Sequence, residues 1–585
     1  MTSILLTAIF VLLVISPLAA PSHEGDGPVV RVSQGQLRGA RLERSANSSL
    51  HTLYAFKGVP YARPPVGELR FKDPVEPETW TGIRDASTYG SACVQKNLGS
   101  GNVTGEEDCL YLNIFTADPP ELWSTTKRPV IVIIHGGAFV QWNGNMEFTR
   151  PDPLLKEGVL VVSINYRLGV MGFLNTEDSQ APGNAGLKDQ TMALRWVQRN
   201  IAAFGGDPNK VTIMGESAGG ASVHYHLLSP LSRGLFHGAI SVSGSALPAW
   251  ARVQRPREQA LALRRRLAGA CPQLPEDDIV SCLRQVDAQE LVFNQYDLPR
   301  EPYQRYILKN TFLPSVETAS SSNSPFLTTE PEQLMQEGNF TQVPYMTGFT
   351  NGEGIMILHF MNLLSDPSAW AEVDEHFEAI FRWELPPGHR TPEGARQLRR
   401  FYLGDRSLRD AHLNNDTLQK FVQLCTDTFF ASGTATSARL MADHGAPVYV
   451  YQFSRDGPIA FLKNMVYKAT HIPGVMHGDD MAYVFDFIVR DSGELRPVPS
   501  SERPLRERQV QFIEEFVKYG RPTPEENGVV HWPLFTSVNE TYLDINRELS
   551  TNRPVLEDRA NFWRRLDTEN FSTEDSTRQL NSRKR

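Results

Sequence analysis

Short apolar runs alternate with segments of helical periodicity through the middle of the chain. The run from Val130 to Ile134 is apolar throughout, as is typical of a strand buried on both faces of a parallel sheet. Four more strands are predicted at Val159–Ile164, Val211–Met214, Ala239–Val242 and Val448–Phe453. Because helical segments lie between them, we expect an α/β fold with a large, mostly parallel sheet flanked by helices.

Two helices are predicted, one before and one after the strand Val211–Met214. Apolar residues recur at every third or fourth position from Gln190 to Ala203, and Gly205 and Gly206 end that helix. A second helix is expected from Ala218 to Leu228, directly after the strand Val211–Met214.

The segment from Val253 to about Leu334 is more helical and more polar than its surroundings. We interpret it as an excursion from the sheet, with Arg264-Arg265-Arg266 on a solvated face. Residues 23–565 are therefore expected to form a single domain. The tail over 566–585 is rich in Ser, Thr and Arg and is expected to be disordered.

The N-terminus has the layout of a signal peptide. Ile4–Ile15 is an uncharged, almost wholly apolar run that is too short for a bilayer span, and Pro17 and small residues follow it. We predict a signal peptide over 1–22, with cleavage after Ser22 or, alternatively, after Ala20. A buried N-terminal helix is the competing interpretation. Nothing later resembles a membrane helix, so a secreted, extracellular protein is expected.

Charge and cysteine placement fit that compartment. The net charge is -9, and Lys and Arg are spread along the chain, which argues against a nucleic-acid partner. In an oxidising compartment two near pairs of cysteines suggest local disulfides, although spacing alone does not fix the connectivity. The pairs are Cys93 with Cys109 and Cys271 with Cys282, and Cys425 is left over. No metal-binding spacing accompanies them, so no metal or cofactor is expected.

Six Asn-x-Ser/Thr sequons are candidate glycosylation sites in a secreted protein. They lie at Asn47, Asn102, Asn339, Asn415, Asn539 and Asn570.

The strongest local motif is Gly215-Glu216-Ser217-Ala218-Gly219, which joins a predicted strand to a predicted helix. This is the pattern of a nucleophile elbow, in which a sharp turn lifts a serine hydroxyl above the sheet. The two glycines leave room where a Cβ would collide with backbone. Ser217 is therefore the candidate nucleophile, and an inert serine in a Gly-rich turn is the alternative.

A serine nucleophile needs a base, and the base needs an orienting acid. His477 is preferred as the base because it follows the late strand and lies between glycines, with His471 as its rival. His224 and His226 are expected to be structural. For the acid we select Glu353 in the loop Asn351–Gly354, although residue patterns alone do not separate it from carboxylates such as Asp416.

The run His135-Gly136-Gly137-Ala138-Phe139 directly follows a buried strand and predicts an oxyanion hole. Small residues let backbone N–H groups approach a developing oxyanion. The expected donors are Gly137, Ala138 and Ala218, with a plain Gly-rich turn as the alternative. Phe139 at the end of this run is a candidate substrate-binding residue.

Several stretches resemble the type-B carboxylesterases, the family that includes cholinesterases. The run Phe204–Gly219 is similar to its active-site signature and Glu107–Asn113 to its second signature; Asn165–Gly169 and Gly183–Gln190 are also family-like. The resemblance covers roughly residues 28 to 565 and is strongest to secreted insect carboxylesterases. It implies an α/β-hydrolase fold and the hydrolysis of small-molecule esters.

By position, the resemblance implies that Ser217 is the nucleophile, Glu353 the acid and His477 the base. It also implies the Cys93–Cys109 and Cys271–Cys282 disulfides. Trp250 resembles a tryptophan of the family's acyl pocket, although an aromatic residue there could equally belong to the core.

Departures from the family pattern narrow the range of expected substrates. The loop between Cys93 and Cys109 lacks the cation-binding Trp of cholinesterases, which argues against choline esters. Juvenile hormone esterases usually carry Gln before the nucleophile, where this chain has Glu216. A general carboxylesterase is expected, with a juvenile hormone esterase, a triglyceride lipase or a non-catalytic adhesion relative as alternatives.

Overall fold

The computed structural model describes residues 27–566, except for 44–49, 98–99, 148, 297, 299–311, 323, 489–494, 525–530 and 553–557. The predicted signal peptide, nearly all of the predicted C-terminal tail, and the sequons at Asn47 and Asn570 lie outside the described residues.

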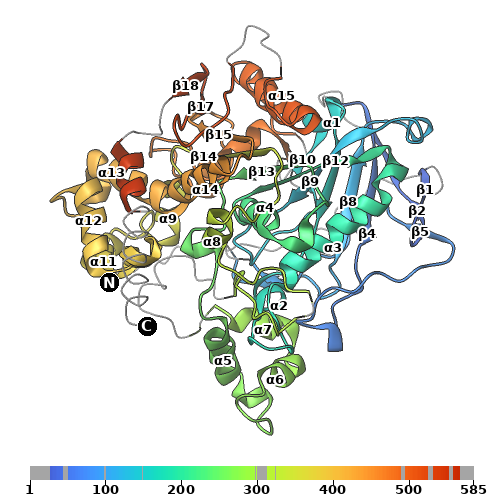
Figure 1. The fold of residues 1–585 in the computed structure, drawn as a ribbon, viewed down its shortest axis with the longest axis horizontal. Helices are drawn as coiled ribbons and strands as arrows, with labels where there is room; N and C mark the ends of the chain where they lie inside the picture. The colour runs from blue at the N-terminus through green and yellow to red at the C-terminus, as the bar shows by residue number, and fades with distance from the viewer. Residues whose placement is uncertain are drawn as a thin grey trace, which may run out of the picture.

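Within the described residues, 11 strands form one sheet that crosses the molecule (Figure 1). In spatial order they are β18 (Ser550–Asn552), β17 (Tyr542–Ile545), β15 (Val448–Phe453), β14 (Tyr345–Thr350), β13 (Gly238–Val242), β12 (Gly206–Glu216), β9 (Arg128–Ile134), β11 (Leu160–Ile164), β8 (Tyr111–Thr116), β4 (Thr52–Pro60) and β3 (Ala40–Glu43). All pairs from β17 to β11 are parallel, whereas the pairs at both edges are antiparallel. The predicted mostly parallel sheet is confirmed.

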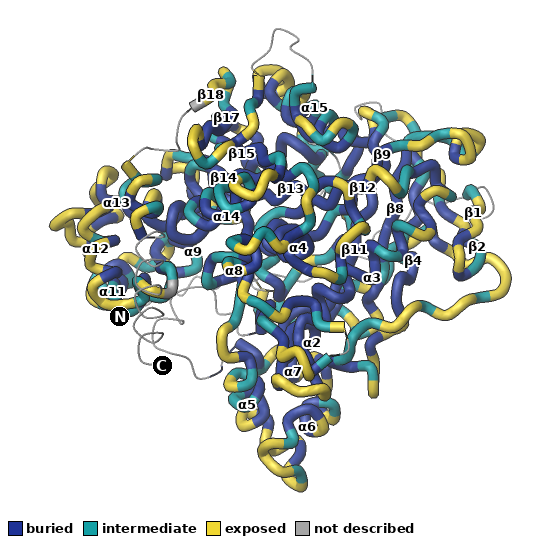
Figure 2. The backbone as a smooth tube through the Cα atoms, viewed as in Figure 1, coloured by how far each residue is buried: buried dark blue, intermediate teal, exposed yellow. Residues whose placement is uncertain are grey.

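Side chains of the central strands alternate between two hydrophobic layers, as the twofold period of a strand requires. On β9, Val130, Val132 and Ile134 join the layer that also holds residues of α3 (Ala185–Asn200) and α4 (Ala218–Leu228). Ile131 joins the opposite layer, which is covered by α15 (Arg503–Tyr519). Central strands of the sheet, such as β11 and β13, are buried along their whole length (Figure 2).

The helix predicted from Gln190 begins five residues earlier, at Ala185, and ends at Asn200 before the 3₁₀ turn η3 (Ile201–Phe204). Gly205 then adopts a left-handed φ of 82°, which confirms the predicted stop. The start was misplaced because Lys188 and Asp189 are polar yet buried in tertiary ion pairs, with Glu317 and Arg167 respectively.

The segment after Trp250 forms helices outside the sheet, as predicted for the part of it that the structure describes. They are α5 (Pro256–Arg266), α6 (Ile279–Gln285), α7 (Ala288–Asn294) and α8 (Pro331–Gln336). The interpretation of Arg264 was wrong, because only Arg265 and Arg266 face solvent. Arg264 is buried, and its guanidinium donates to the carbonyl of Leu274 at 3.0 Å.

Candidate active site

Ser217 lies at the turn between β12 and α4, with φ of 60° and ψ of −122°. Few non-glycine residues adopt this conformation, which persists only where surrounding structure enforces it. Here the Ser217 N–H donates to the carbonyl of Val242 at 2.8 Å, and its own carbonyl accepts from Ala221 N at 2.9 Å. The turn therefore holds the partly exposed side chain above the carboxyl end of the sheet.

The glycines of the motif are required by close backbone contacts. A Cβ on Gly219 would lie 2.1 Å from the carbonyl oxygen of Ile134, and one on Gly215 would lie 2.3 Å from the carbonyl carbon of Gly219. Both distances are far below van der Waals contact. The first turn of α4 thus packs directly against the end of β9.

This packing places the loop after β9, which holds two of the three predicted oxyanion-hole residues, next to the turn that holds Ser217 and Ala218. Gly137 and Ala138 follow β9 with left-handed φ values of 92° and 55°, and Ala218 is the first residue of α4. A Cβ on Gly136 would lie only 3.2 Å from the Cβ of Ser217. The loop after β9 therefore runs alongside the serine.

His135 anchors the start of that loop. Its ring stacks on Tyr166 with centroids 4.4 Å apart, and the Tyr166 hydroxyl donates to the His135 carbonyl at 3.0 Å. Burial lowers the pKa of His135 to about 4. The ring is therefore neutral at physiological pH and serves to hold the loop.

His477 and Glu353 meet in a buried contact. Nδ1 of His477 lies 2.5 Å from Oε2 of Glu353, although 124 positions separate the two residues in the chain. Glu353 follows β14, and His477 lies in the loop after β15, between Gly474 and Gly478. The carboxylate thereby fixes the ring and directs Nε2 away from itself.

Ser243 is a second partner of Glu353 that the sequence analysis did not identify. Its hydroxyl donates to Glu353 Oε1 at 2.6 Å, and the backbone N–H of Thr350 donates to the same oxygen at 2.7 Å. Ser243 has a left-handed φ of 50° at the end of β13. The only available signal was its position after a strand that neighbours β12.

The carboxylate of Glu216 lies against the other nitrogen of His477. Nε2 and Glu216 Oε1 are 2.9 Å apart, in a close ionic contact without hydrogen-bond alignment. Among the described residues, the Ser217 hydroxyl has no hydrogen-bond partner. Burial lowers the pKa of His477, but the charges of Glu216 and Glu353 outweigh it and hold that pKa well above its ordinary value.

A third carboxyl group, that of Asp480, interacts electrostatically with Glu216, Glu353 and His477. Burial, together with the nearby charges of Glu353 and Glu216, raises the pKa of Asp480 to about 8. The Tyr451 hydroxyl donates to Asp480 Oδ2 at 3.3 Å. Asp480 is therefore mainly a neutral acid at pH 7, which limits the negative charge around His477.

The rival residues lie elsewhere or are inert. His471 is exposed, and Asp416 is exposed and paired with Arg406 at 3.0 Å. His224 and His226 are fully buried on α4, and burial lowers the pKa of each to about 3. Both are neutral and hydrogen-bonded within the core, as a structural role requires.

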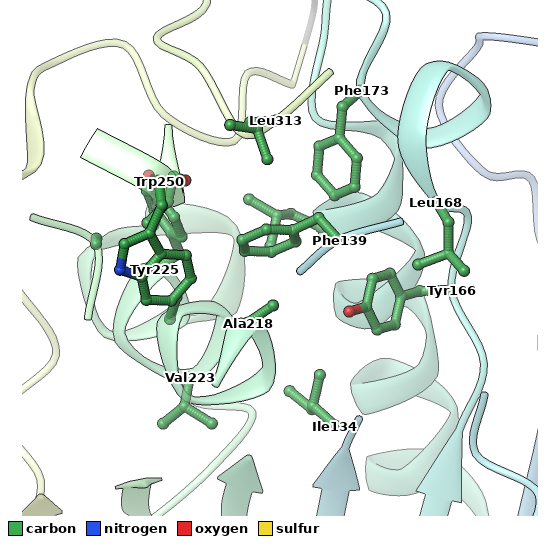
Figure 3. Close-up of a cluster of buried hydrophobic side chains, with 14 of the residues drawn as sticks. Ile134, Phe139, Tyr166, Leu168, Phe173, Ala218, Val223, Tyr225, Trp250 and Leu313 are labelled. Atoms are coloured by element: carbon green, nitrogen blue, oxygen red, sulfur yellow. Dashed lines mark hydrogen bonds between the residues drawn. The ribbon is translucent and has the colours of Figure 1, made fainter. Parts of the chain in front are cut away.

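The predicted substrate-binding residues border the start of α4. Figure 3 draws Phe139 and Trp250 around Ala218, with Leu313 and Phe173 nearby in the same hydrophobic cluster. Phe139 packs edge-on against Phe173 at 5.3 Å. Trp250 donates from its indole to the Phe429 carbonyl at 2.7 Å, and its ring lies 5.7 Å from Phe430, which in turn contacts His477.

Another aromatic residue, Trp142, is 47% exposed and has a left-handed φ of 79°. The side-chain amide of Gln95 holds its backbone, accepting from Trp142 N at 2.6 Å and donating to its carbonyl at 2.9 Å. Gln95 lies in the loop closed by Cys93–Cys109. Sequence reasoning did not find Trp142, because nothing in the pattern distinguishes it.

Both predicted disulfides are present, with Cα atoms 4.9 Å apart for Cys93–Cys109 and 5.5 Å apart for Cys271–Cys282. Cys425 is a buried free cysteine.

The sequon asparagines that the structure describes are all exposed: Asn102, Asn339, Asn415 and Asn539. None of the helices in the described ranges combines the length and the apolar character needed to cross a bilayer.

Comparison with known proteins places the chain in a family. A sequence profile of the carboxylesterase family matches residues 26–563. Juvenile hormone esterase of Tribolium castaneum is 35% identical over 526 residues, covering 87% of this chain and 85% of that protein. Esterase FE4 of Myzus persicae is 35% identical over 518 residues, covering 86% of each chain.

Cocaine esterase of Homo sapiens is 33% identical over 559 residues, covering 93% of this chain and 92% of that protein. The fold is accordingly the α/β-hydrolase fold that the resemblance predicted, and the protein is a carboxylic ester hydrolase. The chain belongs to the carboxylesterase family.

Proposed function

We propose that this hydrolase cleaves esters by acyl transfer through Ser217, His477 and Glu353. One observation carries the proposal: Glu353 holds His477 in a buried contact at the carboxyl edge of the sheet, where an enforced turn presents Ser217. This combination of nucleophile, base and orienting acid is what acyl-transfer catalysis by serine requires.

In the proposed reaction, His477 Nε2 takes the hydroxyl proton while Ser217 Oγ attacks the ester carbonyl. The tetrahedral oxyanion accepts hydrogen bonds from the backbone N–H groups of Gly137, Ala138 and Ala218. His477 then protonates the leaving alcohol, and an acyl-enzyme on Ser217 remains. Water repeats the cycle and releases the carboxylic acid. Glu353 stabilises the imidazolium form of His477 in both halves.

Transfer of the hydroxyl proton from Ser217 to Nε2 of His477 requires a small rearrangement. In the resting structure, Nε2 of His477 faces Glu216 at 2.9 Å. Catalytic hydrogen bonds are often loose before substrate binds and tighten in the substrate complex. We therefore expect substrate binding to turn Nε2 toward Ser217, with Glu216 remaining beside the imidazolium.

We propose a broad range of carboxylic esters as substrates. Two of the three relatives named above are named for juvenile hormone and cocaine as substrates, and their identities to this chain are nearly equal. A juvenile hormone esterase is the second candidate, supported by the match to the Tribolium enzyme. Comparing kcat/KM for short-chain esters, juvenile hormone and long-chain lipids separates these possibilities.

Secretion is part of the proposal. It is supported by the signal-peptide pattern over 1–22, by two disulfides, and by the exposure of the described sequon asparagines. Expression in a eukaryotic secretory system should release glycosylated enzyme into the medium, with an N-terminus at residue 23 or 21.

The test of the catalytic assignment is Ser217→Ala, assayed with an activated short-chain ester. Loss of the nucleophile is expected to lower kcat by about 10⁶-fold, since removal of such a serine disables the whole triad. Ser245→Ala is the matched control, because Ser245 is buried nearby and its hydroxyl has no partner among the described residues. Near wild-type turnover by Ser217→Ala would show the assignment to be wrong.

A further inference from the structure

A buried lysine, Lys463, holds the loop that carries His477. Lys463 lies on the π-helix η12 (Leu462–Val466), and its side chain is only 2% exposed. A buried ammonium group is costly unless charge and hydrogen bonds compensate it, so its partners are informative.

All three N–H groups of the Lys463 ammonium are accounted for. They donate to both carboxylate oxygens of Asp456, at 2.9 and 2.8 Å, and to the carbonyl of Gly474 at 2.7 Å. The N–H of Gly474 donates to Asp456 Oδ2 at 3.1 Å. Lys463 and Asp456 therefore bind both backbone polar groups of Gly474, three residues before His477.

The same turn of η12 also binds the part of the loop that follows His477 in the chain. Asp479, two residues after it, accepts from Leu462 N at 2.8 Å and from Lys463 N at 3.3 and 3.4 Å. Gly474 and Gly478 flank the histidine with φ values of 113° and 77°. Glycines on both sides would let this loop shift, and η12 fixes it on each side.

We propose that Lys463, through its ion pair with Asp456, is a positioning residue that sets the place of His477 relative to Ser217. The proposal rests on the proposed function, and it adds a residue that does not touch the reacting atoms. A displacement of about 1 Å at a catalytic group can cost about 100-fold in rate. Lys463 should therefore govern turnover more than substrate binding.

The experiment measures kcat per active site for Lys463→Met, with sites counted by titration with an organophosphate, at a temperature where the variant is folded. We expect kcat to fall by about 10- to 100-fold while KM stays within about twofold. Lys188→Met is the matched control, because Lys188 is equally buried and paired with Asp73 and Glu317, far along the chain from His477. It should lose stability but keep its kcat per site.

A kcat per site within twofold of wild type in Lys463→Met would overturn the proposal and leave Lys463 a structural residue. If that variant does not fold, Asp456→Asn replaces it, since the Asp456 side chain is 41% exposed and tolerates substitution more readily. Its kcat should also fall, and an unchanged kcat would overturn the proposal. Inactivity of the wild-type enzyme would instead count against the proposed function.

Discussion

At the scale of single residues, three carboxyl groups set the chemistry of His477. Glu353 orients Nδ1, and Glu216 contacts Nε2. Asp480 interacts electrostatically with both carboxylates and stays largely protonated. A base must be neutral to accept a proton, whereas Glu216 and Glu353 favour the charged imidazole. In the proposed mechanism the same charges stabilise the imidazolium that forms during attack. They therefore favour the transition state, while they reduce the fraction of neutral imidazole at low pH.

Replacing Glu216 by Gln should alter the pH dependence of the reaction. Glu216 raises the pKa of His477, and the enzyme needs the neutral imidazole, so activity rises as the pH passes upward through that pKa. Removing the charge lowers the pKa of His477. The acidic limb of the kcat/KM profile is therefore expected to move to lower pH, while kcat on the plateau falls.

The measurement is kcat/KM against pH for both proteins with one short-chain ester. Glu216→Asp serves as the comparison, because it keeps the charge and should keep the limb closer to its wild-type position. If the acidic limb of the kcat/KM profile lies at the same pH in Glu216→Gln as in the wild type, the role given to Glu216 is contradicted.

The site residues that could be predicted from the sequence are those that carry a local motif or a family resemblance. Ser217, Glu353 and His477 were selected from motif, chain order and family resemblance, and the structure brings Glu353 and His477 into contact. Ser243 and Lys463 have no motif. Their roles depend on partners 110 and 11 positions away, which only the folded chain brings together.

At the scale of elements, the strand–turn–helix unit around Ser217 was predicted most accurately. The helix Ala218–Leu228 has the predicted bounds, because the glycine motif and the apolar strand before it are both local signals. The strand β12 begins at Gly206 rather than Val211, with an irregularity in its pairing to β9 between those residues. Its polar first half carries no hydrophobic pattern, so the extension could not be seen.

The elbow depends on close contact between α4 and β9, which predicts a strong effect for Gly219→Ala. The added methyl would meet the carbonyl of Ile134 at 2.1 Å, and the backbone would have to move. Such overpacking costs about 1–3 kcal/mol of unfolding free energy. Displacement of Ala218 should also lower kcat.

Urea denaturation and steady-state assays of Gly219→Ala check this, with Gly269→Ala as the control. A Cβ on Gly269 would meet nothing within 4 Å, so that variant should unfold at the wild-type midpoint. Equal stability of the two variants would refute the packing argument.

At the scale of the whole molecule, polar contacts connect the helical excursion to the segments before β5 (Ile83–Asp85) and β8 that hold Arg70 and Glu107. The guanidinium of Arg70 pairs with Glu107 at 2.5 Å and donates to the carbonyl of Val286 at 2.7 Å. Glu107 belongs to the stretch that resembles the second family signature. That stretch therefore has a structural role in docking the segment after α6, which sequence alone did not reveal.

Arg70→Met should destabilise the whole protein. It leaves the partly buried carboxylate of Glu107 without its partner and removes the donor to Val286, and leaving such polar groups unpaired costs about 1–3 kcal/mol. The exposed pair of Arg63 and Glu78 provides the control, and Arg63→Met should change stability by less than about 1 kcal/mol. Similar urea midpoints for both variants would contradict this account of the docking.

The most direct test of the central claim is covalent labelling by an organophosphate ester, followed by mass spectrometry of the digested protein. The account predicts one phosphoryl group per chain, on the peptide that contains Ser217, with esterase activity lost in proportion to labelling. The Ser217→Ala variant should take up none. Stoichiometric labelling at a different residue, or full activity after Ser217 is labelled, would contradict it.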